Sequence, residues 1–194
     1  MTLLIPYAGL ESSPWKNGAG CTTEIAAAPP GATFDSFDWR ISLATISHDG
    51  PFSHFPGIDR TLALVDGPGA TLDIGNGSRF LLCEEEPIFE FAGEANIAAT
   101  LAGGPTTDFN VMTRRQRCHH RVGRRVLRGE ASFAPRGDVA LLFLAEGESL
   151  SVSSDAERIG LVRFDTIVFD TSTVWTLESV HAVVLIVDIF FSPA

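Results

Sequence analysis

The segment Trp39-Arg40-Ile41-Ser42-Leu43-Ala44-Thr45-Ile46 decides the fold class of this chain. Apolar side chains stand at every second position with Arg40 and Ser42 between them, which is the pattern of a β-strand with two different faces. Short runs of the same kind recur as far as residue 190, and turn signals such as Asp66-Gly67-Pro68-Gly69 separate them at intervals of about 8–12 residues. No segment shows an amphipathic helical stripe, so the sequence predicts an all-β sandwich or barrel.

The number of strand-like runs predicts more than one sheet. About fourteen runs exceed the ~2–10 strands that a single sheet usually holds. We therefore expect two tightly packed β lobes, an N-terminal lobe over residues 1–115 and a C-terminal lobe over residues 116–194. The composition changes from acidic to basic at this boundary, and no flexible linker marks it.

The charge of the chain excludes some partners and leaves one question open. The 194 residues carry a formal net charge of −10, which disfavours direct nucleic-acid binding and anionic membranes. Eight arginines nevertheless fall between Arg114 and Arg136, with Glu130 as the only acid in that window. Such a run is usually a solvated strand face or a seam that pairs with acidic segments; it could also form an anion-binding surface or a homodimer interface.

The N-terminus and the cysteines predict a cytoplasmic protein. The first 18 residues show neither a basic start nor a long apolar stretch, so we expect no signal peptide. The most apolar run, residues 180–191, is shorter than the ~20 residues that cross a bilayer. Cys21, Cys83 and Cys118 are scattered and odd in number, which is typical of free thiols in a reducing compartment.

No standard catalytic or cofactor motif is present. The chain has no nucleophile elbow, phosphate loop or dinucleotide fingerprint. His119 and His120 are adjacent and would point to opposite faces of a strand, and His48 and His54 lack further ligands at a recognisable spacing. We therefore predict no bound metal and no cofactor.

A glycine-rich turn is the first candidate binding segment. Pro14-Trp15-Lys16-Asn17-Gly18-Ala19-Gly20 holds the chain's only lysine beside a tryptophan. Glycines free backbone N–H groups and let a ligand approach closely. A plain tight turn with an exposed lysine explains the pattern equally well.

Arg40 is the second candidate, because an arginine inside an apolar strand is costly unless it is paired. It could pair with an internal acid such as Asp38 or Asp59. It could instead face a cavity with Ser42 and bind a carboxylate through a two-pronged hydrogen bond.

Two further segments carry polar residues in unusual places. The aromatic stretch of residues 50–60 contains Phe55 and ends in Asp59-Arg60, which predicts an ordered loop over the mouth of a barrel. On a strand at residues 108–115, one face carries Asp108, Asn110, Met112 and Arg114. That row suits either the wall of a polar cavity or a solvent-exposed face.

These segments together resemble the HutD/Ves family. The resemblance rests on the 14–20 turn with Thr23-Glu24-Ile25-Ala26, on Phe37-Asp38-Trp39-Arg40-Ile41-Ser42, on residues 50–60, on Phe91-Ala92-Gly93 and on Asp108-Phe109-Asn110-Val111-Met112. It covers about the first 115 residues. It implies a cupin-like double-stranded β-helix barrel of the bicupin type without paired metal-binding histidines. It also implies a link to histidine utilisation, with formylglutamate, formate or urocanate as ligands.

Two hypotheses about function follow. The first is a non-enzymatic protein that binds a small anionic metabolite in the N-terminal barrel and tunes histidine utilisation. Its ligand-binding residues would be Trp15, Lys16, Asn17, Trp39, Arg40, Ser42, Phe55, Arg60, Asn110 and Arg114. The second is a metal-independent cupin isomerase or hydrolase acting on a histidine-degradation intermediate, with Glu24, Asp59 or Asp108 as the general acid–base.

Overall fold

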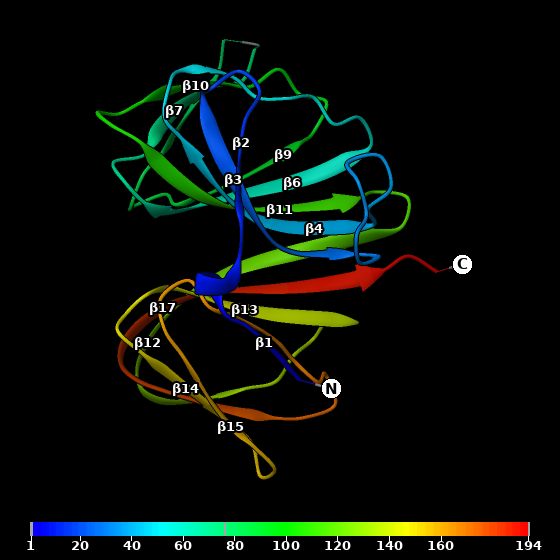
Figure 1. Ribbon diagram of the computed structural model, residues 1–194, viewed down its shortest axis with the longest axis vertical. Helices are drawn as coiled ribbons and strands as arrows, with labels where there is room; N and C mark the ends of the chain where they lie inside the picture. Colours follow the sequence, from blue (N-terminus) through cyan, green and yellow to red (C-terminus); the bar gives the residue numbers. More distant parts are fainter. Residues whose placement is uncertain (1, 76, 194) are drawn as a thin grey trace. The chain divides into compact units, whose positions relative to one another are not determined.

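The computed structural model describes residues 2–75 and 77–193, and β-strands make up nearly all of its regular structure (Figure 1). The strands are β1 (Leu3–Ile5), β2 (Ser12–Pro14), β3 (Gly20–Ala28), β4 (Trp39–Ile46), β5 (Gly50–Pro51), β6 (Ile58–Asp66), β7 (Ala70–Asp73), β8 (Arg79–Leu82), β9 (Ile88–Ala92), β10 (Ala98–Leu101), β11 (Thr106–Arg114), β12 (Cys118–Phe133), β13 (Val139–Glu146), β14 (Leu150–Ser153), β15 (Arg158–Leu161), β16 (Thr166–Val168) and β17 (Trp175–Phe191). The only helix in the described parts is the three-residue 3₁₀ turn η1 (Tyr7–Gly9). The all-β prediction is therefore confirmed.

The chain divides into two compact units. One comprises residues 10–118, and the other combines residues 2–9 with residues 119–193. The sequence analysis placed the boundary three residues earlier and assigned the N-terminus to the first lobe. Strand β1 instead pairs with β16, in the register Leu3↔Val168, so the first residues belong with the C-terminal unit.

Two antiparallel sheets form the unit of residues 10–118. The larger has the strand order β2-β3-β4-β11-β6-β9, and β4, β11 and β6 lie side by side in Figure 1. The smaller has the order β5-β10-β7-β8. Strand β3 was not predicted, because Gly20 and a run of alanines weaken its alternating pattern.

Apolar side chains of both sheets form the core of this unit. The cluster consists of Ala70, Leu72, Leu82, Phe89, Ile97 and Ala99, with Leu64, Phe52 and Phe91 packed against it. Both faces of β4 are buried, since Arg40 and Ser42 are as inaccessible as Ile41 and Leu43. The alternation seen in the sequence therefore separates a polar buried face from an apolar buried face, and it does not separate core from solvent.

The second unit has a largely apolar core, with Asp165 and Thr166 as its buried polar residues. Strand β17 pairs with β12, β13 and β14, and the cluster around it contains Leu142, Leu150, Phe169 and Trp175. Strand β12 carries the arginine-rich segment, and Arg121, Arg124 and Arg128 are exposed along it. This exposure is what a solvated strand face predicts.

The cysteines and the lengths of the helices can be compared with the predictions from the sequence. All three cysteines are free thiols, as the sequence predicted. Burial raises the pKa of the Cys118 thiol to about 11, and its Sγ donates a hydrogen bond to the carbonyl oxygen of Asp38 at 3.2 Å. No helix within the described residues is long and apolar enough to cross a membrane.

Candidate functional site

Strand register gathers the polar candidates on one face of the larger sheet. Ser42 of β4 lies between Glu24 of β3 and Asn110 of β11. Two residues further along, Met112 of β11 lies between Arg40 and Arg60. Residues opposite one another in an antiparallel sheet share a face. The polar residues on this face include Glu24, Arg40, Ser42, Arg60, Asp108 and Asn110, together with Thr22, Thr106 and Arg114.

Arg60 is a buried cation with an incomplete set of partners. Its residue is 8% exposed, and its Nη2 donates a long hydrogen bond of 3.4 Å to Oδ1 of Asn110. Its Nε is buried and has no hydrogen-bond partner among the described residues, none of which forms an ion pair with it either. Burial lowers the pKa of Arg60 to about 10, against the opposing attraction of Asp108.

Three phenyl rings surround the Arg60 guanidinium. Its central carbon lies 4.8 Å from the ring centre of Phe91, 5.4 Å from that of Phe55 and 5.7 Å from that of Phe52. Aromatic faces attract cations but do not supply the in-plane acceptors that a guanidinium N–H needs. The rings therefore exclude water from Arg60 and leave its Nε–H available.

Asp108 is the buried acid of the same face. It is 2% exposed, and its strand neighbours are Ala44 of β4 and Leu64 of β6. No described residue forms a hydrogen bond to its carboxyl group. Burial raises the pKa of Asp108 to about 7, and the positive charge of Arg60 only partly offsets this effect.

Arg40 differs from Arg60 because it already has an acidic partner. Its Nε donates to Oε2 of Glu24 at 2.7 Å, and its Nη1 donates to Oγ of Ser42 at 3.3 Å. The Glu24 side chain is 45% exposed, so this ion pair reaches solvent at one end. The acids suggested by the sequence are engaged elsewhere, Asp38 with Arg117 and Asp59 with Arg115.

Two stacked aromatic rings lie over the two arginines. Phe34 and Phe55 stack with ring centroids 5.5 Å apart. The Arg40 guanidinium lies 4.8 Å from the centre of the Phe34 ring, as the Arg60 guanidinium lies over Phe55. Phe34 is 54% exposed, so the stacked pair forms the outer boundary of this polar interior.

Backbone contacts hold both ring-bearing loops. Arg114 donates from Nε to the carbonyl oxygen of Phe37 at 2.9 Å and from Nη2 to that of Asp35 at 3.0 Å, which fixes the loop of Phe34. On the other side, the Phe55 N–H donates to the carbonyl oxygen of Gly93 at 2.8 Å. A Cβ at Gly93 would collide with the Phe55 and Ile58 carbonyl oxygens, so this close approach requires glycine.

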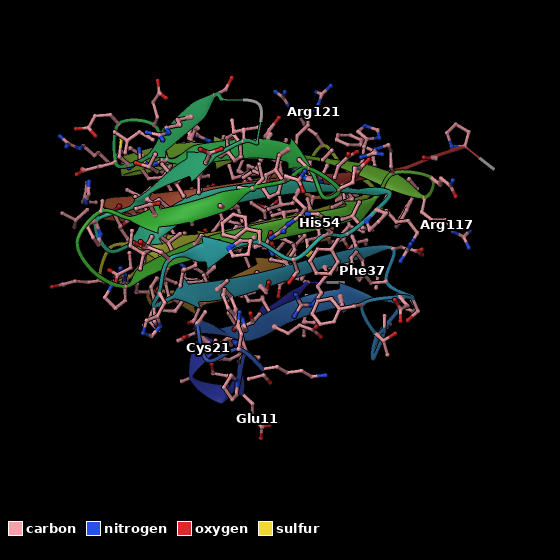
Figure 2. All side chains as sticks on the ribbon, turned by 90° about the horizontal axis from the view of Figure 1, so that it is seen from above. Glu11, Cys21, Phe37, His54, Arg117 and Arg121 are labelled. Atoms are coloured by element: carbon pink, nitrogen blue, oxygen red, sulfur yellow. The ribbon has the colours of Figure 1, made fainter. Side chains whose placement is uncertain are left out.

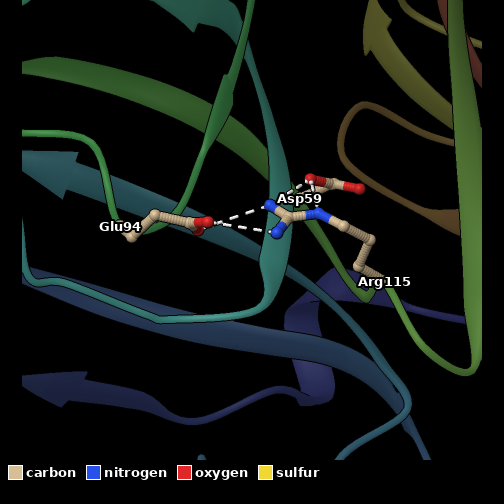
Figure 3. Close-up of polar contacts among 3 residues, drawn as sticks. All are labelled: Asp59, Glu94 and Arg115. Carbon is tan, nitrogen blue, oxygen red and sulfur yellow. Dashed lines mark hydrogen bonds and ion pairs between the residues drawn. The ribbon is translucent and has the colours of Figure 1, made fainter.

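An ion-pair cluster supports the start of β6 from outside the barrel (Figure 3). Arg115 binds Oδ1 of Asp59 at 2.7 Å and Oε1 of Glu94 at 3.0 Å. Asp59 precedes Arg60 on the strand and therefore faces the opposite way. Hydrogen bonds to Arg115 lower the pKa of Glu94, and the cluster ties the turn after β9 to β6.

The turn that carries Trp15, Lys16 and Asn17 is held by short-range hydrogen bonds. Trp15 Nε1 donates to Thr22 Oγ1 at 2.7 Å, and Thr22 is on the polar face in the row of Ala44 and Asp108. The Ala19 N–H donates to Asn17 Oδ1 at 3.0 Å. Lys16 is exposed, and a Cβ at Gly20 would collide with the Thr45 carbonyl oxygen.

Trp39 differs from the prediction in its face, and Arg114 differs in its contacts. Trp39 is on β4 one residue before Arg40, so its side chain is on the opposite face of the sheet. Arg114 is on the predicted face, but both of its side-chain hydrogen bonds go to backbone carbonyls of the Phe34 loop. The structure thus brings together Arg40, Ser42, Phe55, Arg60 and Asn110.

Sequence reasoning did not identify Phe34 or assign roles to Phe52 and Phe91. Phe34 lies in an irregular loop, and only its place in three dimensions reveals that it covers Arg40. Phe91 alternates with an exposed residue on β9, and it faces Arg60 across the β6–β9 ladder. That pairing depends on a register that the sequence alone does not give.

The structure offers no metal-ligating cluster among residues 2–75 and 77–193, where no group of three histidine, cysteine, aspartate or glutamate side chains could hold an ion. His54, labelled in Figure 2, is exposed on the loop before β6. What the polar interior can do is bind an acceptor: it holds one partly unpaired guanidinium, an amide, a hydroxyl and one buried carboxyl group.

Comparison of the sequence with known proteins gives a consistent result. The family model of HutD matches residues 7–186. Protein Ves of Citrobacter koseri is 43% identical over 129 residues, which are 66% of this chain and 65% of that protein, so the chain spans just under two thirds of that relative. An uncharacterized 21.2 kDa protein in the hutC 3′ region of Pseudomonas putida is 35% identical over 76% of this chain and 77% of its own.

Comparison with solved structures agrees. A structure of HutD from Pseudomonas fluorescens SBW25, described as a formate condition, superposes with a TM-score of 0.82 at 25% identity and covers all of both chains. A cupin 2 conserved barrel domain protein from Leptotrichia buccalis has a TM-score of 0.62 at 10% identity, covering 96% of each chain. The second likeness shows the fold alone, an all-β cupin-like architecture.

Proposed function

Since this chain belongs to the HutD family, we propose that it is a non-enzymatic binding protein for a small carboxylate and that it tunes histidine utilisation. The ligand carboxylate lies against Arg60 in the barrel of residues 10–118. Ser42 and Asn110 provide further hydrogen bonds, and Phe34 and Phe55 shield the bound anion from water.

The observation that carries this proposal is the unpaired Nε of Arg60. A buried N–H without an acceptor costs free energy, and a buried cation without an anion costs more. A carboxylate is the partner that matches a guanidinium, because two parallel N–H···O bonds fit its two oxygens. A ligand carboxylate therefore gives Arg60 a hydrogen-bond acceptor for Nε and a directly bound anion, neither of which a described residue supplies.

Arg60 and Arg40 differ in how available they are to a ligand carboxylate. Glu24 already occupies Arg40 Nε at 2.7 Å, whereas no described acid forms an ion pair with Arg60. Arg60 is therefore the primary anchor, and Arg40 contributes positive charge from the opposite side of β11. The ring of Phe55 lies against one face of the Arg60 guanidinium, so the N–H groups at the edge of the guanidinium are the ones that can bind a ligand.

Formate, urocanate and formylglutamate are the ligands to test first. All three are carboxylates, and all three fit a role in histidine utilisation. The titrations use metal-stripped protein, the Arg60→Met variant and an Arg117→Met control, whose arginine is exposed and extends away from the ribbon (Figure 2). Methionine keeps most of the apolar volume of the arginine stem and removes its charge.

We expect Arg60→Met to weaken binding by about 30-fold or more, which corresponds to the ~2–5 kcal/mol lost when one partner of a buried charge pair is removed. Arg117→Met should bind like the wild type. Equal affinities of wild type and Arg60→Met would overturn the proposal.

One observation favours a second function, an isomerase or hydrolase acting on a histidine-degradation intermediate. The pKa of Asp108, raised by burial to about 7, suits a general acid–base. Glu24 and Asp59 are less suited to that role, since both are held in ion pairs. Incubating urocanate or formylglutamate with wild type and Asp108→Asn and following products by NMR separates the two functions. Turnover lost in the variant would establish the enzyme.

The proposal also covers the domain organisation, the cellular compartment and the oligomeric state. We interpret the two units as the two lobes of a bicupin, with the site in the first lobe and a largely apolar core filling the second. The free thiols fit a reducing cytoplasm. A homodimer formed through the arginine-rich strand β12 stays a prediction, which light scattering over a range of concentrations tests.

A further inference from the structure

We propose that Asp108 is a second ligand-binding group of this site: it takes one proton from solvent when the ligand carboxylate binds to Arg60, and its O–H then donates a hydrogen bond to that carboxylate. This inference rests on the proposed function. It adds that a proton enters with the ligand and that the bound species is a carboxylate shared between a guanidinium and a neutral carboxylic acid.

The geometry places Asp108 beyond the tip of Arg60. The Arg60 guanidinium reaches along β11 to Oδ1 of Asn110. Asp108 is the next residue of β11 on the same face, one same-face step of about 7 Å from Asn110. A small carboxylate that accepts hydrogen bonds from Arg60 at this point lies between the guanidinium and the Asp108 carboxyl group.

Asp108 has the free capacity that this role requires. Its carboxyl group is buried and receives no hydrogen bond from a described residue. An ionised carboxylate in such surroundings is costly, whereas a protonated one needs only an acceptor for its O–H. The ligand carboxylate is that acceptor.

The charges around Asp108 require the proton. The charged groups that share its face are Arg60 of β6, Arg40 of β4, Glu24 of β3 and, at the far end of β11, Arg114. Arg40 is paired with Glu24, and the Arg114 guanidinium donates to the backbone carbonyls of Phe37 and Asp35. The smaller sheet contributes the apolar side chains of Ala70, Leu72 and Ala99, and β9 contributes Phe89 and Phe91. His48, His54 and Glu90 are exposed, and Asp73 alternates with buried Leu72 and binds Arg79.

The net charge of the Asp108, Glu24, Arg40 and Arg60 side chains changes when a carboxylate binds. With Asp108 and Glu24 both ionised, their two negative charges balance Arg40 and Arg60. A bound carboxylate adds one uncompensated negative charge to an apolar interior, and protonation of Asp108 removes it. The raised pKa of Asp108 supports this step, because little free energy is needed to protonate it near neutral pH.

The ligand affinity should therefore depend on pH in one direction. Below about pH 7 Asp108 is already neutral and the dissociation constant is constant. Above this pH the proton must be taken up on binding, and the dissociation constant rises about tenfold for each pH unit. A ligand bound without Asp108 would show no such rise.

Calorimetry with sodium formate at pH 8 tests the proposal directly. Wild type, Asp108→Asn and the matched control Asp73→Asn are titrated in phosphate and in Tris, whose ionisation enthalpies differ. We expect uptake of close to one proton per bound formate in wild type and Asp73→Asn. We expect none in Asp108→Asn, which still binds because the amide keeps the shape and a donor.

Other outcomes overturn the proposal in distinguishable ways. Formate binding without proton uptake in wild type overturns this inference and leaves the proposed function standing. Equal uptake in Asp108→Asn assigns the proton to another group and also overturns it. Absence of formate binding by wild type overturns this inference and argues against the proposed function itself.

A second measurement needs no variant. The ¹³C resonance of the Asp108 carboxyl group in wild type reports its pKa with and without saturating formate. We expect the pKa of Asp108 to rise on binding, because formate adds a negative charge beside the carboxyl group and engages Arg60. An unchanged or lowered pKa overturns the inference.

Discussion

Phe34 stacks on Phe55 at 5.5 Å between ring centroids, and each ring lies over a different arginine of the barrel interior. The two rings come from separate loops, one before β4 and one before β6. The pair therefore joins the ring over Arg40 to one of the three rings around Arg60. We predict that the stacked pair is the entrance to the proposed site.

Removing the outer ring should affect binding more than folding. In Phe34→Ala, the stack and one cation–π contact are lost, each worth about 1 kcal/mol. Because the Phe34 ring is 54% exposed, the melting temperature should change little, whereas carboxylate affinity should fall about fivefold through faster dissociation. Stopped-flow binding and thermal melting measure the two effects.

The control for this variant is Phe191→Ala, a phenylalanine of similar exposure at the end of β17. It should leave the dissociation rate unchanged. Equal dissociation rates in Phe34→Ala and wild type would show that the stacked pair is not the entrance.

Arg114 should act as a positioning residue for this entrance. Arg114→Met removes two hydrogen bonds to the carbonyl oxygens of Phe37 and Asp35, and charged donors of this kind contribute about 1.5–3 kcal/mol each. We expect hydrogen exchange of the Ser36 and Phe37 amides to become faster. The affinity should fall moderately and the protein should be destabilised.

Arg117→Met serves here as the comparison, because the exposed Arg117 side chain makes one ion pair, at 3.7 Å to Asp38, and donates no hydrogen bond to residues 33–37. If Arg114→Met leaves exchange in the loop of residues 33–37 unchanged, Arg114 does not hold it.

Glu24→Gln distinguishes the binding protein from the enzyme. The substitution releases Arg40 Nε from its 2.7 Å ion pair and removes one negative charge from the face that holds Arg60. A ligand carboxylate then meets a second unpaired guanidinium, so we expect its affinity to rise about tenfold, with about 1 kcal/mol lost in stability because Glu24 is half exposed. Weaker binding, or the loss of a measured turnover, would instead give Glu24 a direct role toward the ligand.

Asp108 should give the protein's stability a pH dependence of known sign. Its pKa is about 7 in the folded protein and ~3.9 in an unfolded chain. Between these values only the folded state holds the proton, so the free energy of unfolding falls as the pH rises from ~4 to ~7, by at most about 4 kcal/mol.

Urea unfolding of wild type and Asp108→Asn at pH 5, 6, 7 and 8 checks this sign. The wild type should lose stability relative to the variant across that range. Parallel curves for the two proteins would mean that Asp108 is ionised at little cost in the folded state.

The sequence predicted most of the strands and several of the buried polar residues. It did not predict which side chains contact those polar residues. Alternation identified β4 and β6, and the cost of an arginine in an apolar strand singled out Arg40. The partner of Arg40 was not predictable, because Glu24 is on β3, whose alternation is weak, and their contact depends on the β3–β4 register. Phe34 had no signal, since its role comes from the path of an irregular loop.

Two adjacent residues show the same limit. Trp39 and Arg40 were assigned together to one site, although the period of a strand separates their side chains onto opposite faces. Lys16 stands out in the sequence because it is the only lysine. Its turn is closed by local hydrogen bonds, from the Ala19 N–H to Asn17 Oδ1 and from the Gly18 N–H to the Trp15 carbonyl oxygen, which the amino-acid composition does not reveal.

The Nε–H resonance of Arg60 reports whether this group binds the ligand carboxylate, because it has no hydrogen-bond partner in the free protein among the residues described. It is assigned by its absence in Arg60→Met and followed while formate, urocanate or formylglutamate is added. We expect a downfield shift that saturates with the binding isotherm, as a charged hydrogen bond forms. Saturable binding of a carboxylate that leaves this resonance unmoved would show that Arg60 is not the anchor.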